Sequence, residues 1–451
     1  MTDGTGMEPQ QPRESQEPQK PQESEPMLKA ADTRTRGRSR TVLAALLATT
    51  ALTATTQLAL PAPMARADDS GQCTFPSKKY EGRPWALQRV NLDELWAQSK
   101  GEGVRVAVID TGVDVKNPQL TQAVDVSRGK NFLPAKNKKG EEIERGNASG
   151  TTDTVGHGTR VAGIIAARPA KGTGFVGLAP EATIIPIKQN DAEGNGTAVT
   201  LAEAIRYAVD AGADVINISQ DTANAIRPDG RLEQAVRQAL DRDVVVVASA
   251  GNDGLGGNVK VTYPASYEGV LAVASSDRNN ERAPFSQSGE FVGVAAPGVD
   301  MISTVPGNGH CSDNGTSFSA PYVAGVAALL KAKYPKWTAR QIVAQIEQTA
   351  ERTIPGHDRL VGWGVVDPVK ALTDVDPANP VESPRPERNL TGAQAPSVDP
   401  VHFGETADER NVRLGTYVVV GGLVLAAGLS GTAIAVRDAR RRRGLRGGPA
   451  C

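Results

Sequence analysis

The chain has few of the side chains that most often bind transition metals, and almost no net charge. Its 451 residues include three cysteines and four histidines, and these form no Cys/His cluster with the spacing of a zinc site. The formal net charge is −1, and the one dense basic cluster, Arg440–Arg443, lies near the C-terminus. These shortages argue against a zinc-binding module and against a nucleic-acid-binding protein.

The N-terminal region does not have the composition of a globular domain. Residues 1–26 are rich in Gln, Pro and Glu, which is typical of disorder. Several lysines and arginines then precede the apolar run TVLAALLATTALTATTQLAL, and Ala65-Arg66-Ala67 follows it. This order predicts a secretory signal peptide that is cleaved before Asp68.

A second hydrophobic segment lies near the C-terminus. Tyr417–Val436 carries no charge and is long enough to cross a bilayer as a helix, which takes about 20 residues. Arg437 and Arg440–Arg443 follow it, and positive charge marks the cytoplasmic side. We therefore expect a single-pass protein of the cell membrane whose main body is extracytoplasmic. The alternative, a buried core helix, fits poorly between the Pro-rich stretch PANPVESPRPER and an arginine run.

Between these segments, apolar runs alternate with helical patterns. The runs are rich in Val and Ile, as expected for strands of a parallel sheet that are buried on both faces. Strands are predicted at 104–110, 183–188, 214–219, 243–251 and 270–276, and helices at 158–167, 197–211, 231–241, 317–333 and 338–351. The predicted fold is α/β, with a parallel sheet flanked by helices.

Four polar residues occupy positions where such a sheet binds ligands, outside the carboxyl ends of its strands. Asp110 ends the first predicted strand, and Asn252 follows the fourth. His157 and Ser317 lie where two helices begin, in V-G-H-G-T-R-V-A-G and N-G-T-S-F-S-A-P. Each has a glycine close by, which permits tight turns and close approach of a substrate backbone. The four side chains can therefore converge on one face.

Together these residues can carry out nucleophilic catalysis. Ser317 needs a base, His157 can serve as one near neutral pH, and Asp110 can orient the imidazole. The Asn252 amide and the free N–H groups at the helix start can hold an oxyanion. Taken singly, Ser317 could be a helix cap, His157 a surface histidine and Asp110 a strand end. Asp153 is expected only to cap a turn. His310, His357 and His402 stand in no motif and are expected to be non-catalytic.

The motifs D-T-G, H-G-T-x-V-A-G and G-T-S-x-x-A-P, in this order and with A-G-N before the last, resemble those of the subtilisin-like serine proteases. The stretches G-V-A-A-L-L-K-A-K-Y-P and V-G-W-G-V-V-D-P-V-K-A-L-T are similar to those of the mycosins, membrane-anchored subtilases associated with type VII secretion. The resemblance implies a serine endopeptidase with Asp110, His157 and Ser317 as catalytic residues and Asn252 in the oxyanion site. It also implies a protein or peptide substrate and a type VII secretion membrane complex as partner.

The chain departs from the family pattern in three ways. Arg160 stands where many subtilases have histidine, and S-Q-D-T-A-N replaces the substrate-binding S-L-G-G after the V-I-N-I-S strand. The predicted N-terminal extension is only about 30 residues long, too short for the separate inhibitory domain of many subtilases. It is therefore not expected to mask the active site. No cofactor is expected, and calcium, which many subtilases bind, cannot be assigned from spacing.

The cysteines and the architecture complete the expectations. Cys73 and Cys311 are both expected outside the membrane, where thiols tend to pair, so a disulfide between them is predicted; Cys451 is expected to be cytoplasmic and free. An alternative function is a structural component of the secretion complex, with proteolysis secondary. The predicted parts are a leader with signal peptide (1–67), an extension (68–99), a catalytic domain (100–373), a Pro-rich linker (374–416), a transmembrane helix (417–436) and a basic tail (437–451).

Overall fold

The computed structural model describes residues 73–136, 139–192, 196–219, 230–257, 261–387 and 405–444. Several predictions fall outside these ranges: the leader, the signal peptide and its cleavage site, most of S-Q-D-T-A-N, His402 and Cys451. The expected linker is described only in part.

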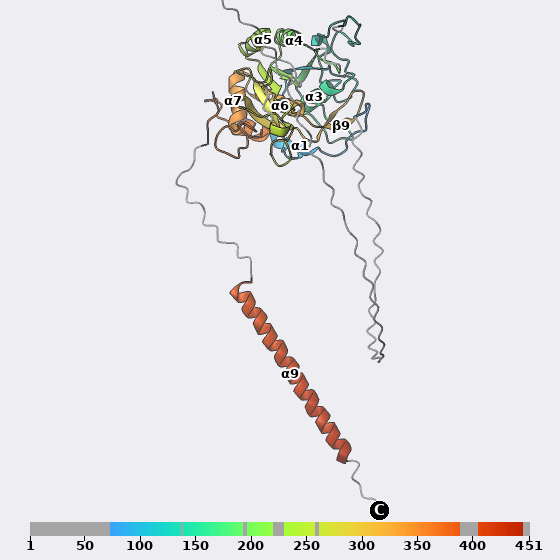
Figure 1. Ribbon diagram of the computed structural model, residues 1–451, viewed down its shortest axis with the longest axis vertical. Coiled ribbons are helices and arrows are strands. Elements are labelled where there is room, and N and C mark those ends of the chain that lie inside the picture. The colour runs from blue at the N-terminus through green and yellow to red at the C-terminus, as the bar shows by residue number, and fades with distance from the viewer. Residues whose placement is uncertain are drawn as a thin grey trace, which may run out of the picture. The chain divides into compact units, whose positions relative to one another are not determined.

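The body of the protein (Figure 1) is built on a parallel sheet of seven strands. Their order in the sheet is β2-β3-β1-β4-β5-β6-β7. All five predicted strands are present, with slightly shorter bounds for four of them. The strands are β1 (Arg105–Asp110), β2 (Lys130–Asn131), β3 (Thr183–Lys188), β4 (Val215–Ile218), β5 (Val245–Ser249), β6 (Leu271–Ser276) and β7 (Val292–Pro297). The register places Asp110 opposite Lys188 of β3, at the carboxyl edge of the sheet.

Helices cover both faces of this sheet. On one face lie α3 (His157–Ala166), α6 (Thr316–Lys333) and α7 (Ala339–Thr349); on the other lie α4 (Ala198–Asp210) and α5 (Gly230–Leu240). Successive residues of β1 feed the two cores in turn: Val106 and Val108 belong to the first, Ala107 and Ile109 to the second. This alternation explains the unbroken apolar runs, because each strand buries both of its faces.

The central helix α6 positions the predicted nucleophile. Every residue from Thr316 to Lys331 is buried, and the helix packs across β4, β5, β6 and β7. A helix that is apolar all round belongs in a core, and each fully buried Leu or Val contributes about 1.5–3 kcal/mol. Its first turn is therefore held in a fixed place under the carboxyl edge of the sheet.

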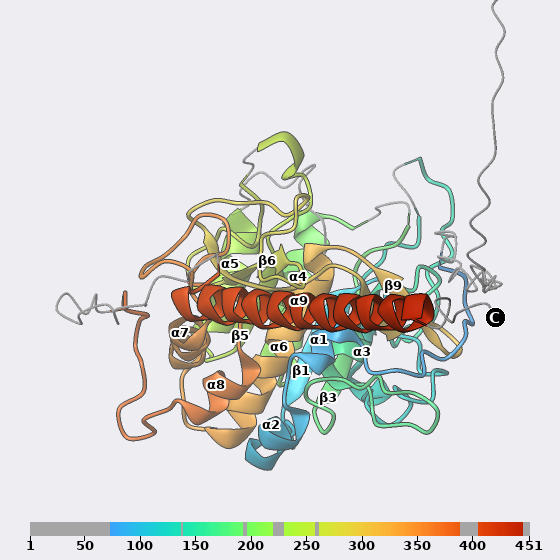
Figure 2. The same cartoon turned by 90° about the horizontal axis from the view of Figure 1, so that it is seen from below.

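The N-terminal extension packs onto the same core as α6. It contains α1 (Trp85–Gln88) and α2 (Leu92–Gln98), and it buries Leu87, Leu92 and Leu95. Helix α2 lies beside α8 (Pro368–Thr373) (Figure 2). The extension is thus an integral layer of the body.

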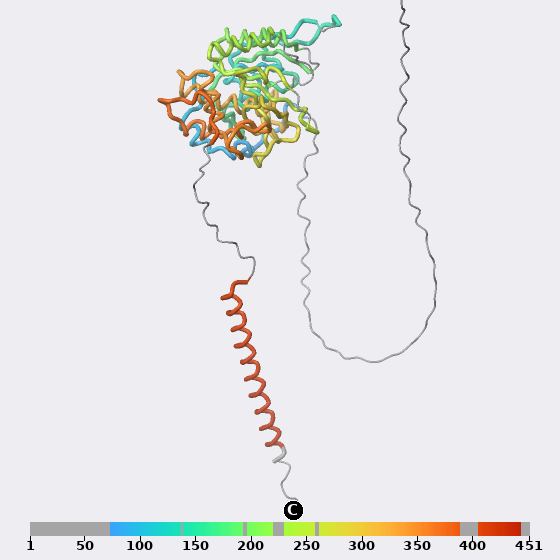
Figure 3. The backbone as a smooth tube through the Cα atoms, turned by 60° about the vertical axis from the view of Figure 1, so that its left-hand side comes forward, coloured from blue at the N-terminus to red at the C-terminus, as the bar shows by residue number. Residues whose placement is uncertain are grey.

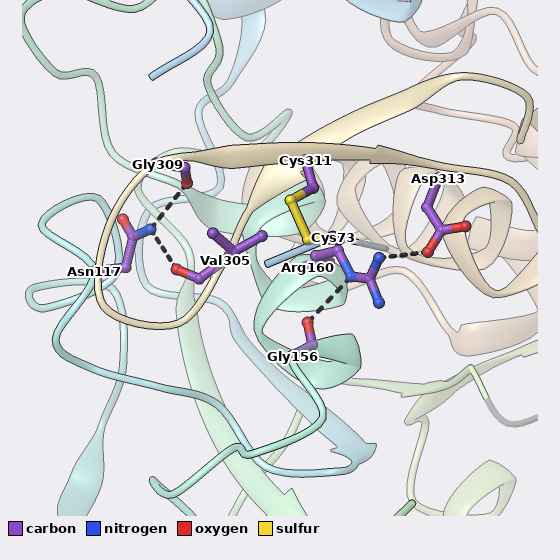
Figure 4. Close-up of a disulfide and its surroundings, with 8 residues drawn as sticks. All are labelled: Cys73, Asn117, Gly156, Arg160, Val305, Gly309, Cys311 and Asp313. Carbon is purple, nitrogen blue, oxygen red and sulfur yellow. Dashed lines mark hydrogen bonds and ion pairs between the residues drawn. A yellow bond between two sulfur atoms is a disulfide. The ribbon is translucent and has the colours of Figure 1, made fainter. Parts of the chain in front are cut away.

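A covalent bond also holds the start of the extension. The predicted Cys73–Cys311 disulfide is confirmed, with the two Cα atoms 5.9 Å apart (Figure 4). Cys311 lies in β9 (His310–Asp313), which pairs antiparallel with β8 (Met301–Thr304). Backbone bonds from Ser77 to Asn308 and from His310 to Lys78 continue this attachment.

The C-terminal segment forms one long helix, α9 (Ala407–Gly444), drawn without a break in Figure 3. Within it, Ala407–Arg442 is long and apolar enough to cross a membrane, with a mean hydropathy of 2.0 in its most apolar window. The predicted span, 417–436, lies inside this helix. The helix also takes in the end of the expected linker and most of the expected tail, because polar residues such as those of 407–414 are compatible with helix even though they are not apolar. Two short 3-10 helices, Val126–Arg128 and Leu255–Gly257, complete the described elements.

Candidate active site

The four predicted residues occupy the expected positions on the elements. Asp110 is the last residue of β1, and His157 is the first residue of α3. Ser317 is the second residue of α6, and Asn252 follows β5 in the loop that begins at Ala250. All four therefore stand at the ends of elements, where backbone and side-chain polar groups are free to face a ligand.

Asp110 and His157 form a hydrogen-bonded pair. The Nδ1–H of His157 donates to Asp110 Oδ1 over 2.8 Å, and the backbone N–H of Thr111 donates to the same oxygen over 2.7 Å. Asp110 is 1% exposed, whereas the His157 side chain is 23% exposed. The carboxylate is thus fixed inside the body while the ring still reaches solvent.

A glycine allows this pair to form. A Cβ atom on Gly158 would lie 2.1 Å from the carbonyl oxygen of Gly112 and 3.1 Å from the Cβ of Asp110. No larger residue fits, so the first turn of α3 can approach the end of β1 only with glycine after His157.

The pKa of the His157 imidazole lies above its ordinary value. Burial of the ring lowers the pKa, but the negative charge of Asp110 and the hydrogen bond to it raise the pKa by more. Arg160 acts to lower the pKa and Asp153 to raise it. The neutral ring, which is the form that can accept a proton, therefore predominates at a somewhat higher pH than in a free histidine.

The helix turn that contains Ser317 lies next to this pair. The ring of Phe318, the residue after Ser317, contacts the His157 ring with 5.3 Å between centroids. Helix α6 begins at Thr316 after Gly315, and no side chain caps it. The reading of Ser317 as an N-cap is therefore wrong, because Ser317 is already inside the first turn. Ser317 is 6% exposed.

Asn252 is oriented by the residue before Ser317. Its Oδ1 accepts hydrogen bonds from the backbone N–H of Thr316 over 2.9 Å and from the Thr316 hydroxyl over 3.1 Å. The amide nitrogen therefore points elsewhere. A Cβ on Gly315 would lie 3.0 Å from Ser317 Oγ and 3.6 Å from Asn252 Nδ2, which places both atoms around one point.

A second set of polar residues supports the first turn of α3, and only Asp153 of this set was considered from sequence. Asp153 accepts bonds from the N–H groups of Val155, Gly156 and Thr159 and from the hydroxyls of Thr111 and Thr159. Burial raises the pKa of Asp153, and its bonds with Thr159 and Gly156 oppose this. The expected turn-capping role is confirmed. In the sequence, the only indication of these hydroxyl partners was the presence of Thr111 directly after Asp110 and of Thr159 in the H-G-T motif.

The histidines outside the motifs have structural partners where they are described. His310 is 6% exposed, accepts a bond from the Tyr80 N–H and pairs with Gln119 over 2.7 Å; burial lowers its pKa to about 4. His357 bonds to the Val292 carbonyl. Within the described ranges, no group of three or more His, Cys, Asp or Glu side chains is arranged to hold a metal ion.

The extension borders the site on the His157 side. A Cβ on Gly156 would lie 3.0 Å from the ring of Phe75 and 3.2 Å from Pro306. Phe75 and Pro76 also line a pocket of about 400 Å³ with Asp153 and Thr154. The extension therefore forms part of the wall beside the site.

Comparison with known proteins agrees with this geometry. The profile of the Subtilase family (peptidase S8) matches residues 101–364. Subtilisin Savinase from Lederbergia lenta is 39% identical over 285 residues, which cover 63% of this chain and 96% of that protein. M-protease from Shouchella clausii is also 39% identical over 285 residues, covering 63% of this chain and 68% of that protein.

Solved structures of mycosins are similar as well. The MycP3 protease from the type VII (ESX-3) secretion system is 34% identical, with a TM-score of 0.57, over 66% of this chain and 90% of that one. MycP1 from Mycobacterium smegmatis is 32% identical, with a TM-score of 0.56, over 70% of this chain and 91% of that one. The family match spans more than half of the sequence and includes all four site residues. The chain therefore belongs to the subtilase family of serine proteases.

Proposed function

We propose that this protein is a membrane-anchored serine endopeptidase that works outside the cytoplasm, with Asp110, His157 and Ser317 as its catalytic residues. The observation that carries the proposal is the bond between His157 Nδ1 and the buried carboxylate of Asp110, beside the helix turn that contains Ser317. An imidazole held in this way has its other nitrogen, Nε2, available to a hydroxyl.

The chemistry follows from these roles. His157 takes the proton of Ser317 Oγ as the oxygen attacks the carbonyl carbon of the scissile peptide bond. It later returns that proton to the leaving amine, which completes formation of the acyl-enzyme. Asp110 holds the tautomer with Nδ1 protonated and stabilises the imidazolium while it exists. Water then attacks the acyl-enzyme by the same steps.

Two donors can stabilise the negative charge on the substrate oxygen. The backbone N–H of Ser317 lies in the first turn of α6. The N–H groups of a first turn have no carbonyl acceptor four residues earlier within the helix. The side-chain oxygen of Asn252 accepts hydrogen bonds from Thr316, so the NH₂ group is the part of the amide that can donate to the substrate oxygen. Donors already in place cost no rearrangement when the charge develops.

A covalent probe tests the nucleophile without knowledge of the natural substrate. A fluorophosphonate should label the wild-type protein, and the label should be lost in Ser317→Ala and in His157→Ala. Peptide mapping should place the adduct on Ser317. Labelling of Ser317→Ala at the wild-type rate would remove Ser317 from the mechanism.

The cellular context is proposed from the anchoring helix and the relatives. Helix α9 is long and apolar enough to span a bilayer, and the neighbouring MycP3 structure is described as a protease of a type VII secretion system. We assign this chain to a type VII secretion membrane complex, where it cuts a secreted or envelope protein.

A structural role in that complex is the second candidate, because a similar MycP1 structure is described as an essential component of its secretion system. Purification from native membranes separates the two roles. If proteolysis is the main role, Ser317→Ala should keep the partner proteins but leave a secreted protein uncut. If secreted proteins are processed normally while deletion of the whole chain disperses the complex, the structural role is the main one.

A further inference from the structure

Arg160 is a buried cation one turn after His157 on α3. It is 9% exposed, and its Nε–H donates to the carbonyl of Gly156 over 3.2 Å. Its Nη1 forms an ion pair with Asp313 of β9, and the centre of its guanidinium lies 5.3 Å from the centroid of the Phe318 ring (Figure 4 shows the ion pair). Nothing in the mechanism above uses this residue.

The contacts of Arg160 link the segments that carry the base and the nucleophile. Gly156 directly precedes His157, and Phe318 directly follows Ser317 and touches the His157 ring. Asp313 lies at the end of the strand that leads into α6. A buried cation costs free energy unless it is paired, so the ion pair with Asp313 offsets the cost of burying Arg160. A planar guanidinium can stack on Phe318 and pair with Asp313 at the same time.

We propose that Arg160 is a positioning residue for His157: through Asp313 and Phe318 it fixes the imidazole relative to Ser317. The inference rests on the proposed catalytic role of His157 and Ser317. To that catalytic pair the inference adds Arg160, a residue that stands where many subtilases have histidine.

The charges around His157 determine the direction in which its pKa should shift when Arg160 or Asp313 is replaced. Asp110 from β1 and Asp153 from the loop before α3 raise the pKa of His157, whereas Arg160 lowers it. Asp313 faces Arg160 from β9 and partly neutralises its charge. Loss of the Arg160 charge should therefore raise the pH at which His157 loses its proton. Loss of the Asp313 charge should do the opposite.

The test measures the rate of fluorophosphonate labelling of the full-length protein against pH. In Arg160→Met the acid midpoint should move up by about 0.5 pH unit, and the plateau should fall about tenfold because the ring is less well placed. Arg160→Lys keeps the charge but not the planar fork, so its midpoint should match the wild type while its plateau falls. In Asp313→Asn the midpoint should move down.

A control comes from an exposed arginine with the same kinds of partner. Arg278 also pairs with an aspartate, Asp300, and also lies over an aromatic ring, that of Trp85 at 5.7 Å. Arg278→Met should leave both midpoint and plateau unchanged. Rates are taken per folded molecule, with melting temperature measured in parallel, and Arg160→Lys and Asp313→Asn carry the test if Arg160→Met does not fold.

Three outcomes would overturn the inference. They are a wild-type midpoint and plateau in Arg160→Met, a fall in melting temperature with no change in labelling rate, and an equal shift in Arg278→Met. Failure of the wild type to label at all is distinguishable, because it refutes the proposed function itself and the role of Arg160 with it.

Discussion

At the scale of single residues, the sequence was informative where a motif holds a reactive group and less so where a partner supports it. Asp110, His157, Asn252 and Ser317 could all be named from their motifs. The bonds that Thr159 and Thr111 make to Asp153 could not, because a threonine in a motif does not reveal which carboxylate it faces. The sequence showed only that Arg160 replaces a histidine found in many subtilases. Its contacts with Asp313 and Phe318 became known from the structure.

The first residue-scale prediction concerns the oxyanion donor. Asn252→Ala should lower the labelling or turnover rate by about 10²–10³, a magnitude measured for the corresponding donor in a subtilisin. The alanine also removes the acceptor of two Thr316 bonds, so its effect mixes chemistry with stability.

Asn252→Asp helps to separate these effects, because it keeps an oxygen for Thr316 but replaces the NH₂ donor with a negatively charged acceptor, which opposes an oxyanion. Its melting temperature should stay near that of the wild type while its rate falls. A wild-type rate in Asn252→Asp would show that the amide does not contact the oxyanion.

The second residue-scale prediction concerns Glu347 of α7. Burial raises the pKa of this carboxyl to about 7, and Arg352 opposes the rise only in part. Since an unfolded glutamate titrates near 4.5, the folded state holds the proton more tightly between those pH values. Stability is therefore lost as pH rises from 4.5 to 7, and the whole penalty is present above pH 7.

Glu347→Gln should consequently stabilise the protein above pH 7 by on the order of 1–3 kcal/mol and have little effect below pH 4.5. Thermal melts across this range measure it. Glu382→Gln is the control: the bonds from Gln341 and Arg340 lower the pKa of that exposed carboxyl, so no stabilisation is expected. An equal gain at pH 4 and pH 8 in Glu347→Gln would rule out ionisation as the cause.

At the scale of elements, prediction followed hydrophobic periodicity. The Val-rich and Ile-rich strands and the long helices were identified because buried elements have continuous or periodic apolar residues in their sequences. Strand β9, with the sequence HCSD, has no apolar pattern; it exists because it pairs with β8 and is bonded to the extension. The short helices α1 and α2 were missed for a similar reason, since packing against the core stabilises them more than their own few residues do.

The element-scale prediction concerns the bond between β9 and the extension. Cys73→Ser should lower the free energy of unfolding by about 2–5 kcal/mol, because the bond closes a long loop in the unfolded chain. Neither sulfur belongs to the proposed catalytic set, so labelling per folded molecule should change little. Melting temperature with and without reductant measures the effect, and Cys451→Ser is the matched control. A variant that melts like the wild type would show that the bond adds no stability.

At the scale of the whole molecule, the sequence predicted a body between two hydrophobic segments. The fold of that body and the apolar character of α9 agree with this layout. The predicted orientation in the membrane is inferred only from the arginines that follow the apolar stretch, because positive charge favours the cytoplasmic side.

The whole-molecule prediction is that protease added to intact protoplasts removes the catalytic body and leaves a small membrane-bound fragment containing α9. An epitope tag after Cys451 should be protected until the membrane is permeabilised. A protected body with a digested tag would reverse the orientation and with it the proposed site of action.

The bond between Cys73 and Cys311 spans 238 positions and makes most of the catalytic body a covalent ring. Asp110 and His157 lie inside the ring, and Ser317 lies just beyond it. One backbone cut within the ring opens it but releases no fragment. A molecule that has been nicked there, by itself or by another protease, will run as a single band on a non-reducing gel. Its two pieces will part only after reduction, so intactness has to be judged on reduced samples.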